Sequence, residues 1–294
     1  MGGKQGRNRR DFLRTTAVLA SLGPLMESVA AQTGGSAASA GKASAEKSSA
    51  DGQGAVAGSR TPTVLITGSN RGIGLEFARR YAARGYRVFA TCRHPAAATE
   101  LQALATKYPG LSVDALDVVD HPGIDALALK LADQPIDILL NNAGLGGGGQ
   151  NQLFTRLNYP VFNDVMAVNA VGPIKMCEAF LKNVLASDQK KMITVSSSQG
   201  SIGSVDAARL YWYRASKSAV NMLMANLALQ LKSPRCHGGS GDPGATDTDF
   251  MKGLPKRMLR PVEDAVTDMM REIDRLDVAR TGAFVDTDGK TLPW

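Results

Sequence analysis

Tyr213 and Lys217 form a pair whose chemistry is that of a proton donor beside a cation. They are spaced i and i+4, so on a helix both side chains lie on one face. A free tyrosine has a pKa of about 10, which is too high for efficient proton donation at neutral pH. A nearby ammonium stabilises the phenolate and lowers that pKa. The pair therefore indicates proton transfer to a substrate oxygen; the alternative is a surface aromatic–cation pair.

Three adjacent serines, Ser196 to Ser198, end an apolar stretch that begins at Lys191. A hydroxyl that donates to a carbonyl oxygen stabilises the alkoxide that forms when the carbonyl is reduced. Together these groups predict carbonyl reduction, with hydride from a nicotinamide and the proton from Tyr213. The residue types alone do not select one serine of the three.

A glycine-rich turn over residues 67–74 separates an apolar run from a stretch with helical spacing. A strand, glycine turn and helix bring a pyrophosphate to the helix N-terminus, where free N–H groups and the helix dipole favour negative charge. Glycine is needed there because a Cβ would keep the backbone away from the phosphates. The alternative for such a turn alone is a simple change of chain direction.

The cofactor expected at this turn is NADP(H) rather than NAD(H). An NAD-binding fold places an acidic residue at the end of its second strand, where it holds the ribose 2′-hydroxyl. Here the second strand is expected over residues 86–91 and is followed by Cys92 and Arg93. Arg93, together with Arg71 from inside the glycine turn, would provide two guanidinium groups that suit a 2′-phosphate. The alternative is that both arginines are ordinary solvated residues.

The elements that must position these residues alternate along the chain. Strands are expected at residues 63–66, 86–91, 111–116, 136–140, 191–198 and 282–285, with helices between them. Strands that alternate with helices at this spacing predict an α/β fold, a single Rossmann-type doubly wound parallel sheet with helices on both faces. A further helix, expected over 162–180 with a kink at Pro173, contains Asn169. Asparagine is a poor helix former, so Asn169 suggests a local distortion or a bound water.

The glycine turn at 67–74, followed by Asn-Asn-Ala-Gly at 141–144 and Tyr-x-x-x-Lys at 213–217, resembles the short-chain dehydrogenase/reductases. The resemblance covers residues 61–294. The sequence segments at 90–93, 213–217 and 288–294 resemble those of one branch of that family, the C-factor and sniffer-like carbonyl reductases.

The resemblance implies a set of site residues. The family's Ser-x-x-Gly pattern selects Ser197 through Gly200, so the implied catalytic residues are Ser197, Tyr213, Lys217 and Asn169, the last holding a water in a proton relay. The residues implied to bind the cofactor are Gly68, Asn70, Arg71, Gly72, Ile73, Gly74, Arg93, Asp117, Val118, Asn141, Ala143, Gly144, Tyr213, Lys217, Pro243, Gly244 and Thr248.

The chain departs from the family pattern just before Pro243 and Gly244. A buried apolar strand is expected there, but residues 233–242 contain no apolar side chain except that of Cys236. Glycine and proline are poor in a central strand. Each missing aliphatic side chain would cost about 1.5–3 kcal/mol of burial. The sixth strand is therefore expected to be distorted or absent, which places the nicotinamide end of the site in doubt.

Composition limits the classes of function. The 294 residues are 44% hydrophobic and 21% charged, with a net charge of +7, which suits one sizeable globular domain with an appendage. No basic stripe with interleaved aromatic residues is present, so nucleic acid is not expected as a partner. Cys92, Cys177 and Cys236 lie far apart and indicate neither a metal site nor a disulfide framework.

The first sixty residues differ from the rest. Residues 8–14, Asn-Arg-Arg-Asp-Phe-Leu-Arg, resemble the twin-arginine export signal, so residues 1–31 are interpreted as a signal peptide. The following apolar run is too short to span a membrane stably. The alternative is an uncleaved N-terminal helix or tail. Residues 32–60, rich in Ala, Gly and Ser, indicate a flexible linker. The predicted location is periplasmic or exported, or cytoplasmic if the signal is not used.

These observations predict an oxidoreductase that acts on a small-molecule carbonyl substrate with NADP(H). Two alternatives stay open: an NADP-binding signalling protein with little or no turnover, which the unusual sixth strand favours, and a 3-oxoacyl-thioester reductase. No membrane association beyond export is expected. A homodimer or homotetramer is compatible with the sequence. The loops at 145–160, 200–212 and 249–260 carry no charged cluster that points to one substrate class.

Overall fold

A seven-stranded parallel sheet forms the centre of the protein, with the strand order β3-β2-β1-β4-β5-β6-β7. The computed structural model describes residues 60–232 and 236–294, so the predicted signal peptide and nearly all of the linker lie outside the described residues. The sheet confirms the expected doubly wound α/β fold. Its strands are β1 Thr63–Thr67, β2 Arg87–Cys92, β3 Leu111–Ala115, β4 Ile138–Asn141, β5 Lys191–Val195, β6 His237–Gly241 and β7 Phe284–Val285.

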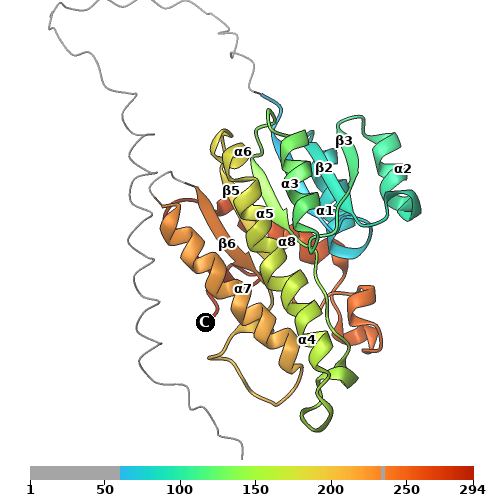
Figure 1. Cartoon of the computed structure of the whole chain (residues 1–294), viewed down its shortest axis with the longest axis vertical. Helices are drawn as coiled ribbons and strands as arrows, with labels where there is room; N and C mark the ends of the chain where they lie inside the picture. The colour runs from blue at the N-terminus through green and yellow to red at the C-terminus, as the bar shows by residue number, and fades with distance from the viewer. Residues whose placement is uncertain (1–59, 233–235) are drawn as a thin grey trace, which may run out of the picture. The chain divides into compact units, whose positions relative to one another are not determined.

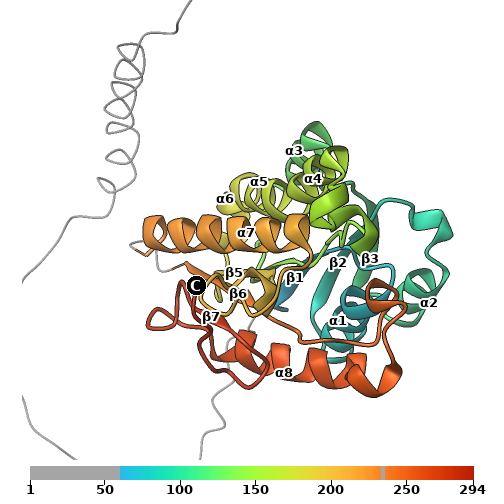
Figure 2. The same ribbon diagram turned by 90° about the horizontal axis from the view of Figure 1, so that it is seen from below.

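Helices cover both faces of this sheet (Figure 1). Seen from below, α1 and α8 lie under the sheet, whereas α3, α4, α5 and α7 lie above it (Figure 2). The helices are α1 Gly72–Ala83, α2 Thr99–Lys107, α3 His121–Lys130, α4 Tyr159–Met166, α5 Gly172–Ala179, α6 Leu181–Leu185, α7 Tyr211–Gln230 and α8 Val262–Arg275. None of the helices in the described ranges is long and apolar enough to cross a bilayer.

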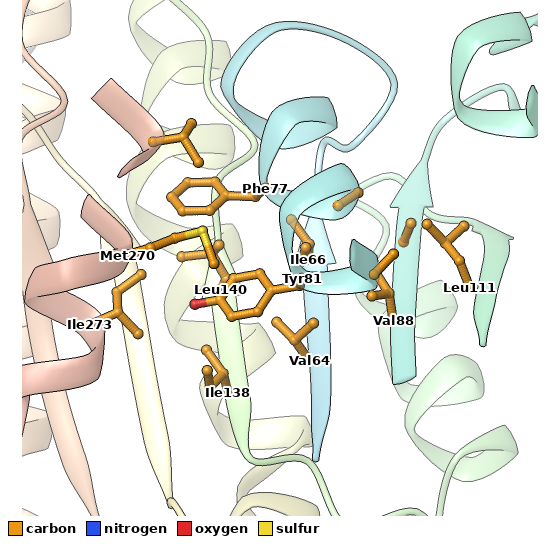
Figure 3. Close-up of a cluster of buried hydrophobic side chains, with 14 of the residues drawn as sticks. Val64, Ile66, Phe77, Tyr81, Val88, Leu111, Ile138, Leu140, Met270 and Ile273 are labelled. Carbon is orange, nitrogen blue, oxygen red and sulfur yellow. The ribbon is translucent and has the colours of Figure 1, made fainter. Parts of the chain in front are cut away.

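The hydrophobic core is divided by the sheet into two layers. In one layer, Phe77 and Tyr81 of α1 and Met270 of α8 pack against Val64 and Ile138 of the sheet (Figure 3). These side chains are completely buried. The layer on the other face lies between the sheet and the helices α3, α5 and α7. Because strands β1 and β4 are buried on both faces, their sequences are almost continuously apolar.

The sixth strand is present, which corrects the expectation that it would be distorted or absent. Strand β6 pairs in parallel with β5 over its whole length, from Lys191↔His237 to Val195↔Gly241. It also pairs with β7. The strand therefore holds its place through backbone hydrogen bonds to neighbours on both sides rather than through its side chains, because Gly238, Gly239 and Gly241 have none.

The expected long helix around Asn169 is divided into three parts. Helix α4 ends at Met166, the segment Ala167–Val171 is π-helical, and α5 begins at Gly172. A π-helical turn contains one residue more than an α-helical turn and is frequent at functional sites. The local distortion predicted from Asn169 is thus confirmed, and it lies four residues before Pro173.

Candidate functional site

The candidate site lies at the carboxyl ends of the parallel strands. Strand β1 pairs with β2 on one side and with β4 on the other, so the chain order reverses next to β1. In open α/β sheets, ligands bind in the crevice outside the carboxyl ends of the strands at such a reversal. The glycine turn follows β1 directly, and the Asn-Asn-Ala-Gly segment follows β4. The fold therefore brings together the two motifs that carry the predicted cofactor site.

Close packing fixes the shape of the glycine turn. Gly68 has a φ of +70°, and a Cβ on it would lie 2.9 Å from the Cα of Ala143. A Cβ on Gly74 would lie 2.2 Å from the Gly68 carbonyl oxygen. Asn142 Nδ2 donates to the carbonyl oxygens of Thr67 and Gly68 at 2.9 and 3.1 Å. The turn thus tolerates no side chain at these glycines and is tied to the segment that follows β4.

The N-terminus of α1 suits a bound anion. Its first residue, Gly72, follows Arg71, which makes no side-chain cap, and the first turn contains no acidic residue. Free backbone N–H groups and the helix dipole are therefore available for phosphate. A Cβ on Gly72 would lie 3.2 Å from Cγ2 of Thr248, so the loop that follows β6 reaches this turn. Asn70 is exposed and Ile73 is half-buried against the core.

The two arginines predicted to select NADP(H) both lie at the surface. Arg71 is exposed and forms an ion pair with Asp249 at 3.3 Å. Arg93 follows the last residue of β2 and is also exposed. Asp117 accepts a hydrogen bond from the Val119 backbone, and Val118 is buried. Arg93 thus lies at the end of β2, whereas Arg71 is held in its ion pair with Asp249.

The asparagines that follow β4 have separate roles. Asn141 is buried, and its Nδ2 donates to the Pro173 carbonyl at 3.3 Å. Its Oδ1 has no hydrogen-bond partner among the described residues, although buried polar atoms are normally paired. Ala143 and Gly144 continue toward Asn169, whose Oδ1 would lie 3.6 Å from a Cβ on Gly144. The unpaired Oδ1 of Asn141 is therefore a buried polar atom between β4 and α5.

Helix α7 carries Tyr213 and Lys217 on one buried face. The Lys217 Nζ atom lies 5.7 Å from the centroid of the Tyr213 ring. It donates a hydrogen bond to the Val195 carbonyl oxygen, at the end of β5, at 2.8 Å. Tyr213 packs against the ring of Phe250 with a centroid separation of 5.5 Å. The structure therefore brings the tyrosine and the lysine to the end of the strand that leads to the serines.

Of the three serines, Ser197 is the one that lies against the tyrosine. Its hydroxyl is close enough to Tyr213 to lower the pKa of the tyrosine, and it accepts the Gln199 backbone N–H at 3.2 Å. Ser196 instead is buried and donates to Oδ1 of Asn221 at 2.6 Å. Ser198 begins a 3₁₀ turn that ends at Gly200. This arrangement agrees with the choice of Ser197.

The expected lowering of the Tyr213 pKa by Lys217 is not found in this structure. Burial raises the pKa of Tyr213 above its ordinary value, and the Ser197 hydroxyl lowers it only in part. Burial also lowers the pKa of Lys217 to about 8, because a charged ammonium is costly in the interior. The ammonium donates instead to the Val195 carbonyl oxygen, and Lys217 is not among the groups that shift the Tyr213 pKa.

Asn169 connects the π-helical segment to the loop after β4. Its Oδ1 accepts the Leu145 backbone N–H at 2.7 Å, and its Nδ2 donates to the Leu145 carbonyl at 2.8 Å and to Ser216 Oγ at 3.0 Å. Both amide hydrogens are thereby used, so the side chain holds the loop beside α7. A water held near Asn169 stays a prediction.

Three residues that shape the site were not identified from the sequence. Asn142 holds the glycine turn, as described above. Gln152 is buried, and its Oε1 accepts the Tyr213 backbone N–H at 2.8 Å, so a distant side chain caps α7. Phe250 covers the Tyr213 ring. A glutamine within an otherwise glycine-rich loop was a weak signal, and the contact of Phe250 is not local in the sequence.

Pro243 and Gly244 form a turn at the end of β6, where Gly244 N donates to Asp242 Oδ1 at 3.1 Å. They follow the carboxyl end of β6, the same edge of the sheet as the glycine turn, and their contact with a cofactor stays a prediction. Within the described residues, no group of three or more His, Cys, Asp or Glu side chains is placed to hold a metal ion.

Comparisons with known proteins identify the family of the chain. A family model described as short chain dehydrogenase matches residues 62–258. An uncharacterized oxidoreductase of Schizosaccharomyces pombe is 31% identical over 249 residues, which cover 78% of this chain and 97% of that protein. The C-signal protein of Myxococcus xanthus is 31% identical over 172 residues, or 58% of this chain and 99% of that protein.

Solved structures extend the likeness to three dimensions. An NADPH-bound carbonyl reductase from chicken fatty liver is 30% identical with a TM-score of 0.74. The carbonyl reductase Sniffer of D. melanogaster is 27% identical, also with a TM-score of 0.74. Each comparison covers 80% of this chain and 100% of the other.

Proposed function

The chain belongs to the short-chain dehydrogenase family, and from this premise we propose that it reduces an aldehyde or ketone to an alcohol with NADP(H), or runs the reverse reaction. The observation that carries the proposal is the grouping of Ser197, Tyr213 and Lys217 at the end of β5, the strand next to β4 and its Asn-Asn-Ala-Gly segment. The carbonyl reductases among the similar structures support the substrate class.

The residues of the crevice fit a nicotinamide dinucleotide. The uncapped N-terminus of α1 and the glycine turn would hold the pyrophosphate, and Arg71 and Arg93 would hold a 2′-phosphate. Thr248, beside Gly72, would border the pyrophosphate. The turn at Pro243 and Gly244 would border the nicotinamide end of the cofactor. When bound, the cofactor supplies or accepts a hydride.

The side chains at the end of β5 have distinct roles in the proposed reaction. The Ser197 hydroxyl donates to the carbonyl oxygen and orients it. Tyr213 donates the proton that converts the developing alkoxide to an alcohol. Lys217 supplies a positive charge to the site, and the Phe250 ring packs against that of Tyr213. In the reverse direction the same groups act in the opposite order.

Replacement of the proton donor tests this proposal. Tyr213→Phe keeps the ring that packs on Phe250 but removes the hydroxyl, so we expect reduction to fall by at least about 100-fold, the lower range for general acid catalysis. NADPH binding should stay within about threefold of the unchanged protein, as measured by nucleotide fluorescence. Retained turnover in Tyr213→Phe would overturn the assignment.

The alternative of an NADP-binding signalling protein with little or no turnover was favoured by the unusual sixth strand, and the structure removes that support. A missing sixth strand would have disabled the nicotinamide end of the site, but β6 is formed and fully paired with β5. The likeness to C-signal covers only 58% of this chain. Turnover on simple carbonyl compounds would favour the proposed reductase over the signalling protein. Turnover only on an acyl-carrier thioester would favour the 3-oxoacyl-thioester reductase instead.

We also propose export through the twin-arginine route, on the strength of Arg9 and Arg10 within residues 8–14. The route carries folded proteins, which suits a protein that takes up its nucleotide before export. Replacement of both arginines by lysine should retain the full chain in the cytoplasm; unchanged fractionation would contradict this.

A further inference from the structure

Asp242 is a buried carboxylate that the proposed mechanism does not use. It follows β6 directly and is only 8% exposed. Its backbone N–H donates to the Val285 carbonyl, which extends the ladder between β6 and β7 by one residue. A buried carboxylate is costly unless a cation or several hydrogen bonds compensate it. Within residues 60–232 and 236–294, its side chain accepts a single hydrogen bond, from Gly244 N at 3.1 Å.

The alternation of β6 shows which way the Asp242 side chain points. A Cβ on Gly238 would meet Ala228 and Met224 of α7, whereas Cβ atoms on Gly239 and Gly241 would meet Leu276 and Met269 on the α8 side. Side chains two residues apart on a strand share a face. Asp242 therefore lies on the face that Gly238 shares with α7.

Lys217 and Tyr213 lie against this same corner of the sheet. Lys217 Nζ is bonded to the carbonyl of Val195, and Val195 is the register partner of Gly241. The next residue of β5, Ser196, donates its backbone N–H to the Gly241 carbonyl at 2.7 Å. The ammonium is thus anchored on β5, next to the strand that Asp242 follows, and the two side chains form no direct ion pair in the described part of the chain.

Among the described residues, the other elements that pack on α7 bring no further charge against the pair, whereas on the α8 side Glu272, Arg280 and Asp286 line a cavity together with Asp242. The 3₁₀ turn 198–200 and the π-helical segment contain no ionisable residue. On α4, Asp164 is exposed, and on α5 Lys175 is paired with Asp125 and Glu178. His237 lies at the opposite end of β6, and Arg214 of α7 itself binds Gln199 and Ala207.

The electrostatic effects agree with this geometry. Among the described residues, Asp242 is the single charge that acts on both groups: it raises the pKa of Lys217 and that of Tyr213. The effect of Asp242 on the pKa of each group is smaller than the effect of burial. For Lys217 the two effects are opposite in sign.

We propose that Asp242 is a positioning residue that acts through Lys217 and Tyr213 and holds both of them in their protonated, proton-donating state. The carboxylate provides the counter-charge that lets Lys217 stay cationic in a buried site. It also disfavours the phenolate of Tyr213, so the hydroxyl keeps its proton until the substrate oxygen takes it. This inference deepens the proposed reductase function and rests on it for its kinetic part.

Asp242→Asn is the informative variant. The amide has nearly the shape of the carboxylate, and its Oδ1 can still accept the Gly244 N–H, so the turn at Pro243 keeps its hydrogen bond. Asp247→Asn is the matched control, because Asp247 lies five residues along the same segment but is exposed and faces Lys256 at 3.8 Å. If Asp242→Asn melts below the assay temperature, Asp242→Ser also removes the charge and retains a hydrogen-bonding turn residue.

The direct measurement is an NMR titration of the lysine ¹³Cε resonances, with Lys217 assigned by its loss in Lys217→Met. This readout needs no turnover. We expect the Lys217 pKa to fall by about one unit in Asp242→Asn, the size of effect that a nearby charge commonly has, and to stay unchanged in Asp247→Asn. An unchanged Lys217 pKa in Asp242→Asn, or equal shifts in both variants, would overturn the inference.

The pH profile of carbonyl reduction is the second readout. Tyr213 and Lys217 titrate as a coupled pair, and loss of the negative charge makes the pair release its first proton at lower pH. The alkaline limb of kcat should therefore move down by about one pH unit in Asp242→Asn. If the lysine titration shifts as expected but no variant reduces any carbonyl, the role of Asp242 as counter-charge stands and the proposed function fails.

Discussion

Strands β4 and β6 belong to the same sheet but are held in it by different means. In β4, Ile138, Leu139 and Leu140 are completely buried and fill the space on both faces. In β6, three of five residues are glycine. The comparison shows that a central strand can be specified by the backbone ladders of its neighbours when its own side chains contribute almost nothing.

The missing side chains of β6 leave space on the α8 face of the sheet. A cavity of about 40 Å³ lies there, lined by Gly239 and Gly241 of the strand, Met269 and Leu276 from the region of α8, and Ile193 of β5. This volume exceeds that needed for one water molecule. Packing in this half of the sheet is therefore less complete than around Ile138, where the side chains of Figure 3 interdigitate.

The largest change in stability is expected when a buried side chain of β4 is truncated. Ile138→Ala removes a fully buried side chain from the layer between the sheet and α8. We expect the free energy of unfolding to fall by about 2–5 kcal/mol, from lost burial and the cavity that remains. Urea denaturation followed by circular dichroism measures this change. A loss below about 1 kcal/mol would show that β4 is no more tightly packed than β6.

A smaller change in stability, of opposite sign, is expected when a methyl group is added to a glycine of β6. A Cβ on Gly239 would lie 3.6 Å from the Ala283 carbonyl oxygen and 3.6 Å from Leu276 Cδ2, which are ordinary contacts. Gly239→Ala should therefore raise the free energy of unfolding by about 0.4–1 kcal/mol, chiefly through the entropy of the unfolded chain.

Gly85→Ala is the control for that variant. Gly85 also has room for a Cβ, but its φ is +81°, a conformation that L-residues adopt at a cost. The same substitution there should lower stability in the same denaturation experiment. A loss of stability in Gly239→Ala would mean that the strand needs its glycines, and the account of β6 would be wrong.

Local sequence was sufficient to predict the elements whose side chains specify them. The apolar runs at β1, β2, β4 and β5 predicted strands that the structure shows to within two residues at their starts, because burial on both faces leaves a clear pattern. The motif residues at 67–74, 141–144 and 213–217 also gather at one edge, since parallel strands align their carboxyl ends.

The features that the sequence did not reveal depend on contacts between distant segments. Strand β6 forms because β5 and β7 supply hydrogen bonds on both sides, which no local pattern records. Gln152 caps α7 from a loop 61 positions away. The helical spacing predicts that Lys217 lowers the pKa of Tyr213, but burial of the tyrosine raises that pKa instead.

The most direct test of the central claim is a titration of the purified protein with NADPH and with NADH, followed by nucleotide fluorescence, alongside the Arg93→Asp variant. The account predicts that NADPH binds at least about tenfold more tightly than NADH, a difference of about 1.4 kcal/mol, and that Arg93→Asp weakens NADPH more than NADH. Equal weakening of both nucleotides would contradict the NADP(H) preference. Binding of neither would show that the crevice at the ends of β1 and β4 is not a dinucleotide site.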